Sequence, residues 1–239
     1  MSKITAILLA AGKGRRMKSD VQKQYMLLNG KPLIWSSRDT FEKSPVDEII
    51  LVVGLGEVEI CRKNIVDAFG FKKVSQIVEG GEERYDSVYE GLKAAEDADY
   101  VLIHDGARPF VTEKIIADNI ETAERERACA TGMPVKDTIK MVDVDNYAIF
   151  TPTRDHVWLV QTPQTFEYPL IREGYEKLME KREKEESEDD RFEVTDDAMI
   201  VERLMRTKVK LIRGSYENIK ITTPEDLVTA QGFVEIQQG

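Results

Sequence analysis

Residues 4–17 read ITAILLAAGKGRRM, and the fold follows from this stretch. Positions 4–9 form a short run of β-branched and apolar residues, which is typical of a buried strand. Gly12, Gly14 and the basic residues around them end that run at once. A buried strand that leads directly into a glycine-rich turn is typical of the first unit of a βαβ arrangement. We therefore expect an α/β protein with a mostly parallel sheet.

The rest of the chain repeats this alternation of short apolar runs and longer amphipathic stretches. Strands are predicted at 4–9, 48–53, 74–78, 100–104, 128–135 and 208–212. Helices, whose apolar residues recur three and four positions apart, are predicted at 33–43, 58–69, 83–95, 113–126, 168–186, 196–205 and 224–235. We expect Thr112 and Thr223 to cap the helices that follow them, with Pro224 at the first helical position of the second.

After position 135 the order of elements changes. Two brief alternating segments, 138–142 and 147–151, flank the turn-prone residues 143–146. This pattern predicts a β-hairpin arm over about 136–156, inserted into the α/β order. A hairpin of this size is marginally stable alone, so we expect it to pack on something else, such as a second subunit.

The chain is acidic overall, but its charge is uneven. It has 239 residues, which fits one large domain or two small ones, and a formal net charge of −10. This balance argues against a nucleic-acid binder, which would carry a basic face. Residues 180–193 contribute −4 from eight acids and four bases, and we interpret them as a solvated helix end and loop. Residues 10–23 contribute +4, because five bases there oppose Asp20 alone.

Localisation and redox state are inferred from what the sequence lacks. The apolar run at 4–11 is far shorter than the roughly 20 residues of a membrane span. It also lacks the greater length and the small-residue cleavage site of a signal peptide, and the cluster of basic residues follows the run instead of preceding it. The isolated Cys61 and Cys129 have no metal-ligand spacing, and with two histidines in the chain a zinc site is not expected. We expect buried free thiols in a cytoplasmic protein that contacts no membrane.

The first loop, AAGKGRRM at 10–17, together with Lys23, suits a bound phosphate. Glycines directly after a strand let the backbone approach a ligand, and unpaired N–H groups there donate to phosphate oxygens. The loop is not a dinucleotide fingerprint, because Met17 stands where the third glycine belongs, and no P-loop Gly-Lys-Ser/Thr follows. An ordinary basic surface turn is the alternative.

Two more strand ends bring polar groups to the same predicted edge of the sheet. GGEERYDSV at 80–88 is a double-glycine turn before a helix, at the edge where open α/β sheets hold ligands, although a simple connecting turn would read similarly. In HDGARP at 104–109, Asp105 emerges from an apolar strand and suits Mg²⁺, with Arg108 near for a phosphate. We interpret His104 as a hydrogen-bonded structural group rather than a base.

The arm and the C-terminal region add further charged candidates. Asp137, Thr138 and Lys140 open the hairpin and Arg154 closes it, so they either converge on one ligand or are exposed charges. Lys220 alternates with two isoleucines and therefore points away from what they bury. Since no Ser/His/Asp or Cys/His arrangement is present, electrostatic handling of phosphate is the chemistry that these residues favour.

Six motifs in this order resemble those of the 2-C-methyl-D-erythritol 4-phosphate cytidylyltransferases of the non-mevalonate isoprenoid pathway: AAGKGRRM…KQY, GGEERYDSV, HDGARP, VKDTIK, VTDDA and NIKITTPEDL. The resemblance covers residues 4–230. It implies a single Rossmann-like nucleotidyltransferase domain over 1–239 with three layers, and a homodimer in which the β-hairpin arm embraces the partner. It also implies a reaction of CTP with the polyol phosphate that releases pyrophosphate, with Mg²⁺ or another divalent cation as cofactor.

The resemblance further implies a role for each matching residue. Arg16 and Lys23 match the transition-state stabilisers, while Arg154 and Lys220 match the pair that holds the substrate phosphate for attack. Asp105 would orient the substrate and the metal. The remaining matching residues would bind one substrate or the other. Those that match nucleotide-binding residues are Ala10, Ala11, Gly12, Gly14, Gly81, Glu82, Ser87 and Gly106. Those that match residues binding the polyol phosphate are Arg108, Asp137 and Thr138. Because Thr138 and Arg154 lie on the arm, we expect each active site to be shared between two subunits.

Two positions depart from the usual family pattern. Gln22 stands where the family often has proline, which implies a less rigid loop. Gly106 stands where alanine is more usual, which implies extra backbone freedom at a nucleotide contact.

Two alternative functions stay open from the sequence. A ribitol 5-phosphate cytidylyltransferase would share the fold and the chemistry, although residues 10–12 and 137–140 favour the methylerythritol substrate. A non-catalytic nucleotide sensor on the same fold could lose Arg16 or Lys23 without loss of its role, whereas this chain keeps both.

Overall fold

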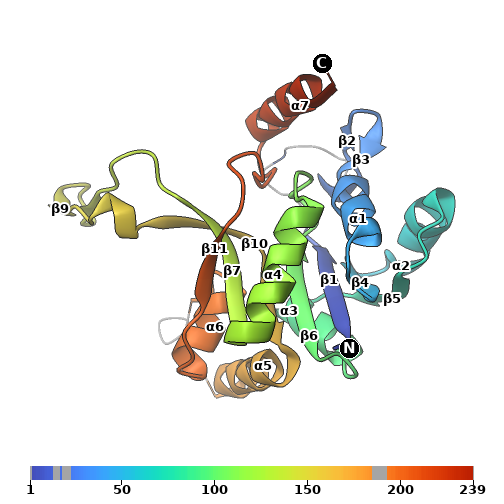
Figure 1. Ribbon diagram of the computed structural model, residues 1–239, viewed down its shortest axis with the longest axis horizontal. Coiled ribbons are helices and arrows are strands. Elements are labelled where there is room, and N and C mark those ends of the chain that lie inside the picture. Colours follow the sequence, from blue (N-terminus) through green and yellow to red (C-terminus); the bar gives the residue numbers. More distant parts are fainter. Residues whose placement is uncertain (1, 13–16, 18–22, 185–192, 239) are drawn as a thin grey trace.

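The computed structural model describes residues 2–12, 17, 23–184 and 193–238. A seven-stranded sheet with the order β11-β7-β10-β6-β1-β4-β5 forms its centre (Figure 1). Its strands, in chain order, are β1 (Ile4–Ala10), β4 (Glu48–Val53), β5 (Val74–Glu79), β6 (Tyr100–Asp105), β7 (Ala128–Pro134), β10 (Trp158–Glu167) and β11 (Lys210–Arg213). Among these strands β10 alone runs antiparallel to both neighbours, so the mostly parallel sheet predicted from the sequence is confirmed.

Helices cover both faces of the sheet. They are α1 (Leu33–Lys43), α2 (Val58–Cys61) continued by the π-helix η3 (Arg62–Asp67), α3 (Arg84–Ala94), α4 (Glu113–Glu126), α5 (Tyr168–Glu183), α6 (Asp197–Leu204) and α7 (Pro224–Gln238). Shorter elements are the 3₁₀ turns η2 (Lys23–Tyr25) and η4 (Arg154–His156), the strand pair β2 (Leu27–Leu28) and β3 (Lys31–Pro32), and the pair β8 (Met141–Val142) and β9 (Ala148–Phe150).

The period-two alternation of the strands divides the core into two layers. In β1, Ile7 packs with α3, α5 and α6 on one face of the sheet. Its neighbours Ala6 and Leu8 pack with α1, α2, η3 and α4 on the other face. Strands buried on both faces must be apolar almost throughout, which explains the continuous apolar runs of the sequence. The three-layer architecture expected from the resemblance is present.

Most predicted elements occur close to their predicted bounds. The helices at 33–43 and 113–126 and the strand at 48–53 match at both ends. The side chain of Thr112 accepts a hydrogen bond from the Ile115 amide, and the side chain of Thr223 accepts one from the Asp226 amide at 3.4 Å, so both predicted caps are confirmed. The helix predicted at 58–69 is less regular than expected, because it changes from α to π geometry after Cys61.

Strand β10 was not predicted, although it lies in the middle of the sheet between β6 and β7. Pro163 interrupts its sequence, and proline cannot donate to a strand ladder. The register with β7 shifts between Val160 and Gln164, so residues 161–163 form an irregularity at which proline is tolerated. This irregularity lies beside the polar end of β6, where the functional candidates gather.

The hairpin arm (residues 136–156) extends away from the body of the molecule (Figure 1). Its paired segments are shorter than predicted, but the hairpin itself is confirmed by β8 and β9. Large apolar side chains on it are exposed, including Tyr147 at 73%, Ile149 at 67% and Phe150 at 61%. A stretch this apolar and this exposed is typical of a surface that contacts another molecule.

The two thiols are free and buried, as predicted. Burial raises the pKa of Cys61 to about 11 and that of Cys129 to about 12, so neither is a reactive thiolate at neutral pH. Within the described residues, every helix is too short or too polar to cross a membrane.

Candidate active site

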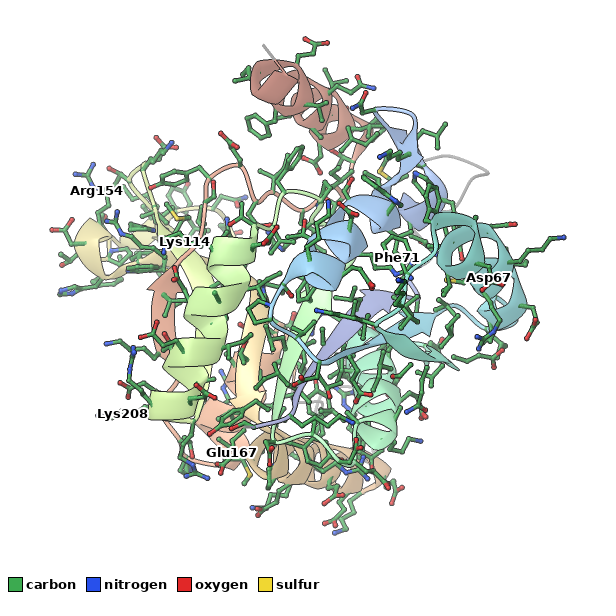
Figure 2. All side chains as sticks on the ribbon, turned by 45° about the vertical axis from the view of Figure 1, so that its right-hand side comes forward. Asp67, Phe71, Lys114, Arg154, Glu167 and Lys208 are labelled. Carbon is green, nitrogen blue, oxygen red and sulfur yellow. The ribbon has the colours of Figure 1, made fainter. Side chains whose placement is uncertain are left out.

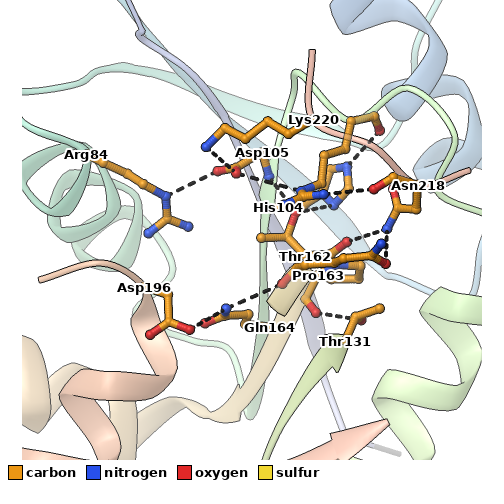
Figure 3. Close-up of polar contacts among 12 residues, drawn as sticks. Arg84, His104, Asp105, Thr131, Thr162, Pro163, Gln164, Asp196, Asn218 and Lys220 are labelled. Atoms are coloured by element: carbon orange, nitrogen blue, oxygen red, sulfur yellow. Dashed lines mark hydrogen bonds and ion pairs between the residues drawn. The ribbon is translucent and has the colours of Figure 1, made fainter. Parts of the chain in front are cut away.

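Asp105 is the last residue of β6 and the centre of a cluster of cations at the carboxyl edge of the sheet (Figure 3). Lys220 Nζ lies 2.8 Å from Oδ2, and Arg84 Nε lies 3.2 Å from Oδ1. Arg108 Nε lies 3.9 Å from Oδ2. Burial alone would raise the pKa of this carboxyl, but the three cations hold it well below its usual range. Asp105 is therefore ionised at any physiological pH.

A cavity of about 240 Å³ opens beside this cluster. Its charged lining consists of Arg84, Asp105, Arg108, Asp196 and Lys220, and Gln161, Thr162 and Gln164 of β10 complete one wall. The cavity thus brings together α3, the end of β6, β10, the start of α6 and the segment before α7. These regions are distant in sequence and meet at the edge of the sheet where open α/β folds bind ligands.

The orientation of Lys220 follows from the residues beside it, as predicted. Ile221 is fully buried and its amide donates to the Ala107 carbonyl at 2.9 Å, while Ile219 packs on the same apolar cluster. Lys220 therefore faces the other way, toward Asp105. Arg108 ties this segment to the turn after β6, because its Nη1 donates to the Asn218 carbonyl at 2.8 Å.

His104 is a structural group, which confirms the interpretation made from the sequence. It is fully buried and lies against Phe41. The Thr162 hydroxyl accepts from the Asp105 amide and lies 3.1 Å from His104 Nδ1, so its own proton is available to donate to that nitrogen. His104 Nε2 then donates to the Arg108 carbonyl at 3.3 Å. Burial lowers the pKa of His104 to about 4, which keeps the ring neutral.

The predicted nucleotide-binding residues that the structure describes lie at the end of β1, in the turns after β1, β5 and β6, and in the first turns of α3. Gly80 packs so closely that a Cβ there would lie 2.7 Å from the Ala11 Cβ and 2.5 Å from the Ser87 hydroxyl. Only glycine fits, and its close approach holds the start of the first loop against the start of α3. Gly12, Gly81 and Glu82 are exposed beside this contact, while Ala10 is buried.

The structure gives a different reason for glycine at position 106 from the extra backbone freedom inferred from the sequence. It is buried, its amide donates to the Leu9 carbonyl at 2.9 Å, and a Cβ there would lie 2.9 Å from the same oxygen. Its φ is not in the left-handed region that favours glycine. Gly106 therefore allows the ends of β1 and β6 to approach closely, rather than giving the backbone extra freedom.

The predicted substrate-binding residues of the arm lie apart from this cavity. Asp137, Thr138 and Arg154 are exposed and do not line it. Arg154 Nη1 lies 3.5 Å from the Lys136 carbonyl, and Figure 2 shows the side chain at the arm, away from the body of the molecule. One chain thus does not bring Arg154 and Lys220 together.

Arg16 and Gly14 lie outside the described residues. Lys23 begins η2, and its side chain is outside the described part of the chain.

Comparisons with known proteins give one consistent family. The family model for 2-C-methyl-D-erythritol 4-phosphate cytidylyltransferase matches residues 4–236. The chain belongs to this family. Curated relatives of that name include those of Alkaliphilus oremlandii, 50% identical over 100% of this chain and 98% of the relative, and Lachnoclostridium phytofermentans, 47% identical over 100% and 99%.

Solved structures agree with this assignment. The 4-diphosphocytidyl-2C-methyl-D-erythritol synthase from Anaerococcus prevotii is 37% identical with a TM-score of 0.84, and the alignment covers 98% of this chain and 96% of that one. The 2-C-methyl-D-erythritol 4-phosphate cytidylyltransferase from Thermus thermophilus is 29% identical with a TM-score of 0.74, covering 96% and 98%. The chain is accordingly a nucleotidyltransferase of the cytidylyltransferase class.

The candidate site contains residues to which sequence reasoning assigned no role. Arg84 binds the buried carboxylate of Asp197 through both terminal nitrogens, and Thr162 and Gln164 belong to the strand that was not predicted. The motifs GGEERYDSV and VTDDA contain Arg84 and Asp197, so the resemblance to the family could have marked both residues as functional candidates. Arg84 and Asp197 are 113 positions apart, and no local sequence pattern predicts a contact between residues so far apart in the chain.

The described residues of this cytidylyltransferase contain no group of three or more potential metal-ligating side chains. Asp105 is a single carboxylate that already faces three cations. These residues do not fit a metal site built by the protein alone, because one carboxylate supplies too few ligand oxygens. A divalent ion here would have to take most of its ligands from substrate phosphates and water, as Mg²⁺ commonly does.

Proposed function

We propose that this chain transfers the cytidylyl group of CTP to 2-C-methyl-D-erythritol 4-phosphate at the cavity beside Asp105. The products are 4-diphosphocytidyl-2-C-methyl-D-erythritol and pyrophosphate, in the non-mevalonate isoprenoid pathway. The cluster of Lys220, Arg84 and Arg108 around an ionised Asp105 carries the proposal, because a polyanionic reaction needs fixed positive charge at the reacting groups.

The proposed chemistry needs no group of the protein to form a covalent bond. An oxygen of the methylerythritol phosphate attacks the α-phosphorus of CTP, and a new P–O bond forms. The bond between that phosphorus and the oxygen bridging to the β-phosphate breaks, and pyrophosphate leaves with the electron pair. Since the attacking phosphate is already anionic, the protein contributes positioning and charge compensation.

We assign the two substrates to different walls of the site. The turns with Ala10, Ala11 and Gly12, with Gly81 and Glu82, and with Gly106 would hold CTP, and Arg16 and Lys23 would stabilise the charge that grows at the α-phosphorus. Ser87 stabilises the helix start that follows the turn with Gly81 and Glu82, because it is buried and its hydroxyl donates to the Glu83 carbonyl at 3.2 Å.

The polyol phosphate would lie on the other side, near Asp105, Arg108 and Lys220. Its phosphate would also need Arg154, with Asp137 and Thr138 beside it, and these residues lie on the protruding arm. A homodimer in which the arm of one subunit reaches the cavity of the other would bring the two groups together. The exposed apolar side chains of the arm support this assembly, because burying them would stabilise it.

A divalent cation would enter with the triphosphate of CTP, with one oxygen of Asp105 as its protein ligand. When bound, it would offset negative charge on the phosphates. The buried free thiols support the expectation of a reducing, cytoplasmic location.

The test of substrate choice is pyrophosphate release, measured with the purified full-length protein and Mg²⁺. We expect release from CTP with 2-C-methyl-D-erythritol 4-phosphate, and little from ATP, GTP or UTP. Release with ribitol 5-phosphate but not with methylerythritol phosphate would instead support the alternative polyol. A chain that binds CTP but releases no pyrophosphate with either polyol would be a nucleotide sensor.

Three single variants test the assigned roles. We expect Arg16→Ala, Lys23→Ala and Lys220→Ala each to lower turnover by about two orders of magnitude or more, as for other lost donors to a transition state. Lys114→Ala is a matched control, because Lys114 is exposed and pairs with Asp118 within α4. Near-normal turnover in any of the three, with the control also normal, would remove that residue from the mechanism.

A further inference from the structure

A buried ion pair lies directly behind the active-site cluster. Asp197, the first residue of α6, is completely buried. Arg84 Nη1 lies 2.7 Å from its Oδ1, and Arg84 Nη2 lies 2.8 Å from its Oδ2. The Tyr175 hydroxyl of α5 donates to Oδ1 at 2.5 Å. Two parallel N–H···O bonds to one carboxylate fix the plane of a guanidinium as well as its position.

The remaining nitrogen of this guanidinium points into the active site. Arg84 Nε donates to Asp105 Oδ1 at 3.2 Å, as Figure 3 shows, and Lys220 holds the other oxygen of the same carboxylate. Because the guanidinium is rigid and planar, fixing Nη1 and Nη2 also fixes the direction of Nε. The contacts therefore run from Tyr175 through Asp197 and Arg84 to Asp105.

Arg84 also connects the two substrate walls assigned above. It is the first residue of α3 and follows the turn that contains Gly81 and Glu82, which we assign to CTP. Asp105 belongs to the wall that we assign to the polyol phosphate. A displacement of Arg84 would thus alter the position of one wall relative to the other.

The charge of the cluster gives Asp197 a second role. Three cations, Arg84, Arg108 and Lys220, lie within 4 Å of the single carboxylate of Asp105. Asp197 keeps both terminal nitrogens of Arg84 occupied. Without its negative charge, the guanidinium would be free to bind a substrate phosphate away from the productive position.

We propose that Asp197 is a positioning residue that acts through Arg84 to hold the Asp105 carboxylate and to keep Arg84 from capturing substrate phosphate. Tyr175 supports it by fixing the Asp197 carboxylate. This inference rests on the proposed function, since Asp105 is placed there beside the polyol phosphate.

The test compares the steady-state kinetics of Asp197→Asn, which keeps the shape of the side chain and removes its charge, with wild type. We expect kcat to fall about 10- to 100-fold, the range in which small misplacements of reacting groups act. We expect KM for methylerythritol phosphate to rise more than KM for CTP, because Arg84 touches Asp105 directly. Asp197→Glu, which restores the charge, is expected to recover part of kcat, and Tyr175→Phe to change kcat in the same direction by a smaller factor.

Controls separate positioning from stability and from the assigned reaction. Glu176→Gln removes a half-exposed carboxylate next to Tyr175, one that pairs with Arg172 and not with Asp197, and should leave all constants unchanged. Each variant is assayed at a temperature well below its measured midpoint of thermal unfolding. If Asp197→Asn does not fold, Arg84→Lys replaces it, because lysine keeps the positive charge but cannot form the two parallel hydrogen bonds of the guanidinium. A folded variant with kcat and both KM values within twofold of wild type overturns the positioning role. Absence of pyrophosphate release by the wild type overturns the proposed function instead.

Discussion

His104 and Asp105 are adjacent in β6, both are buried, and their environments give them opposite charge states. Asp105 keeps its charge because Arg84, Lys220 and Arg108 surround it, which holds its pKa well below its usual range. His104 faces no close carboxylate oxygen among its hydrogen-bond partners, so burial dominates and lowers its pKa to about 4. The local partners of each side chain therefore decide which of the two residues carries charge into the site.

The pH dependence of stability should report the buried His104. Its pKa in the folded state, about 4, lies below the ordinary value of 6.5, so the unfolded chain takes up the proton more readily. The stability that His104 contributes is thus fully present above pH 6.5 and is lost as the pH falls toward 4. Between pH 7 and pH 5 this loss corresponds to about 2 kcal/mol.

Denaturant titrations of wild type and His104→Gln at pH 7 and at pH 5 measure this effect. We expect the wild type to lose about 2 kcal/mol more than the variant over that interval. Parallel losses in the two proteins would mean that His104 is protonated in the folded state and would contradict the neutral assignment.

Single residues at strand ends could be predicted from the sequence, but pairs formed by the fold could not. Asp105 was found because a carboxylate follows an apolar strand, and the direction of Lys220 was found because its neighbours alternate with it. The pairing of Arg84 with Asp197 depends on where α6 docks against α3, and no local pattern encodes that position. The family resemblance located both motifs without showing that they meet.

At the scale of elements, β10 forms one wall of the cavity beside Asp105. Its irregularity at 161–163 places Gln161 and Thr162 at the cavity, while Thr165 and Phe166 remain in the regular ladder. The parallel strands and their helices were predictable because their apolar runs and periodicities are long. β10 was not, because Pro163 and several polar residues lie within it and their partners are supplied by distant elements.

Thr162 tests the importance of this irregular segment. It is almost fully buried, and its hydroxyl accepts from the Asp105 amide and contacts His104. Thr162→Val keeps the volume but leaves the Asp105 amide without that acceptor. We expect the free energy of unfolding to fall by about 1–3 kcal/mol, measured by denaturant titration. Thr162→Ser, which keeps the hydroxyl and removes the methyl group, should lose less. A loss in Thr162→Ser as large as that in Thr162→Val would mean that the hydroxyl contributes no more to stability than the methyl group, and would contradict this prediction.

At the scale of the whole molecule, the arm explains why one chain has an incomplete set of proposed site residues. Lys220, Arg108 and Asp105 lie at the cavity, whereas Arg154 and Thr138 lie on an exposed arm with apolar side chains unburied. A second copy that buries the arm would account for both observations at once. The overall charge of −10 is no obstacle to the proposed reaction, since a bound nucleotide would experience mainly the field of the local cations.

Shared sites make a quantitative prediction for mixed subunits. Lys23→Ala and Arg154→Ala should each be inactive alone, because every homodimer lacks one of the two cations at both sites. If Lys23 of one subunit works with Arg154 of the other, a mixed dimer has one intact site and one site that lacks both residues. Random exchange at equal concentration makes about half of the dimers mixed, so about a quarter of all sites become intact.

Pyrophosphate release after subunit exchange measures this recovery directly. We expect activity to rise from near zero to about a quarter of the wild-type value, with exchange verified by mass spectrometry of differently tagged subunits. The matched control is a mixture of Lys23→Ala with Arg16→Ala, two residues assigned to the same wall of one subunit, which should recover nothing. Full exchange without recovery in the first mixture would place Lys23 and Arg154 of the same chain at one site. The arm would then have to fold back onto its own cavity, because Arg154 is exposed on the arm and does not line that cavity in the single chain.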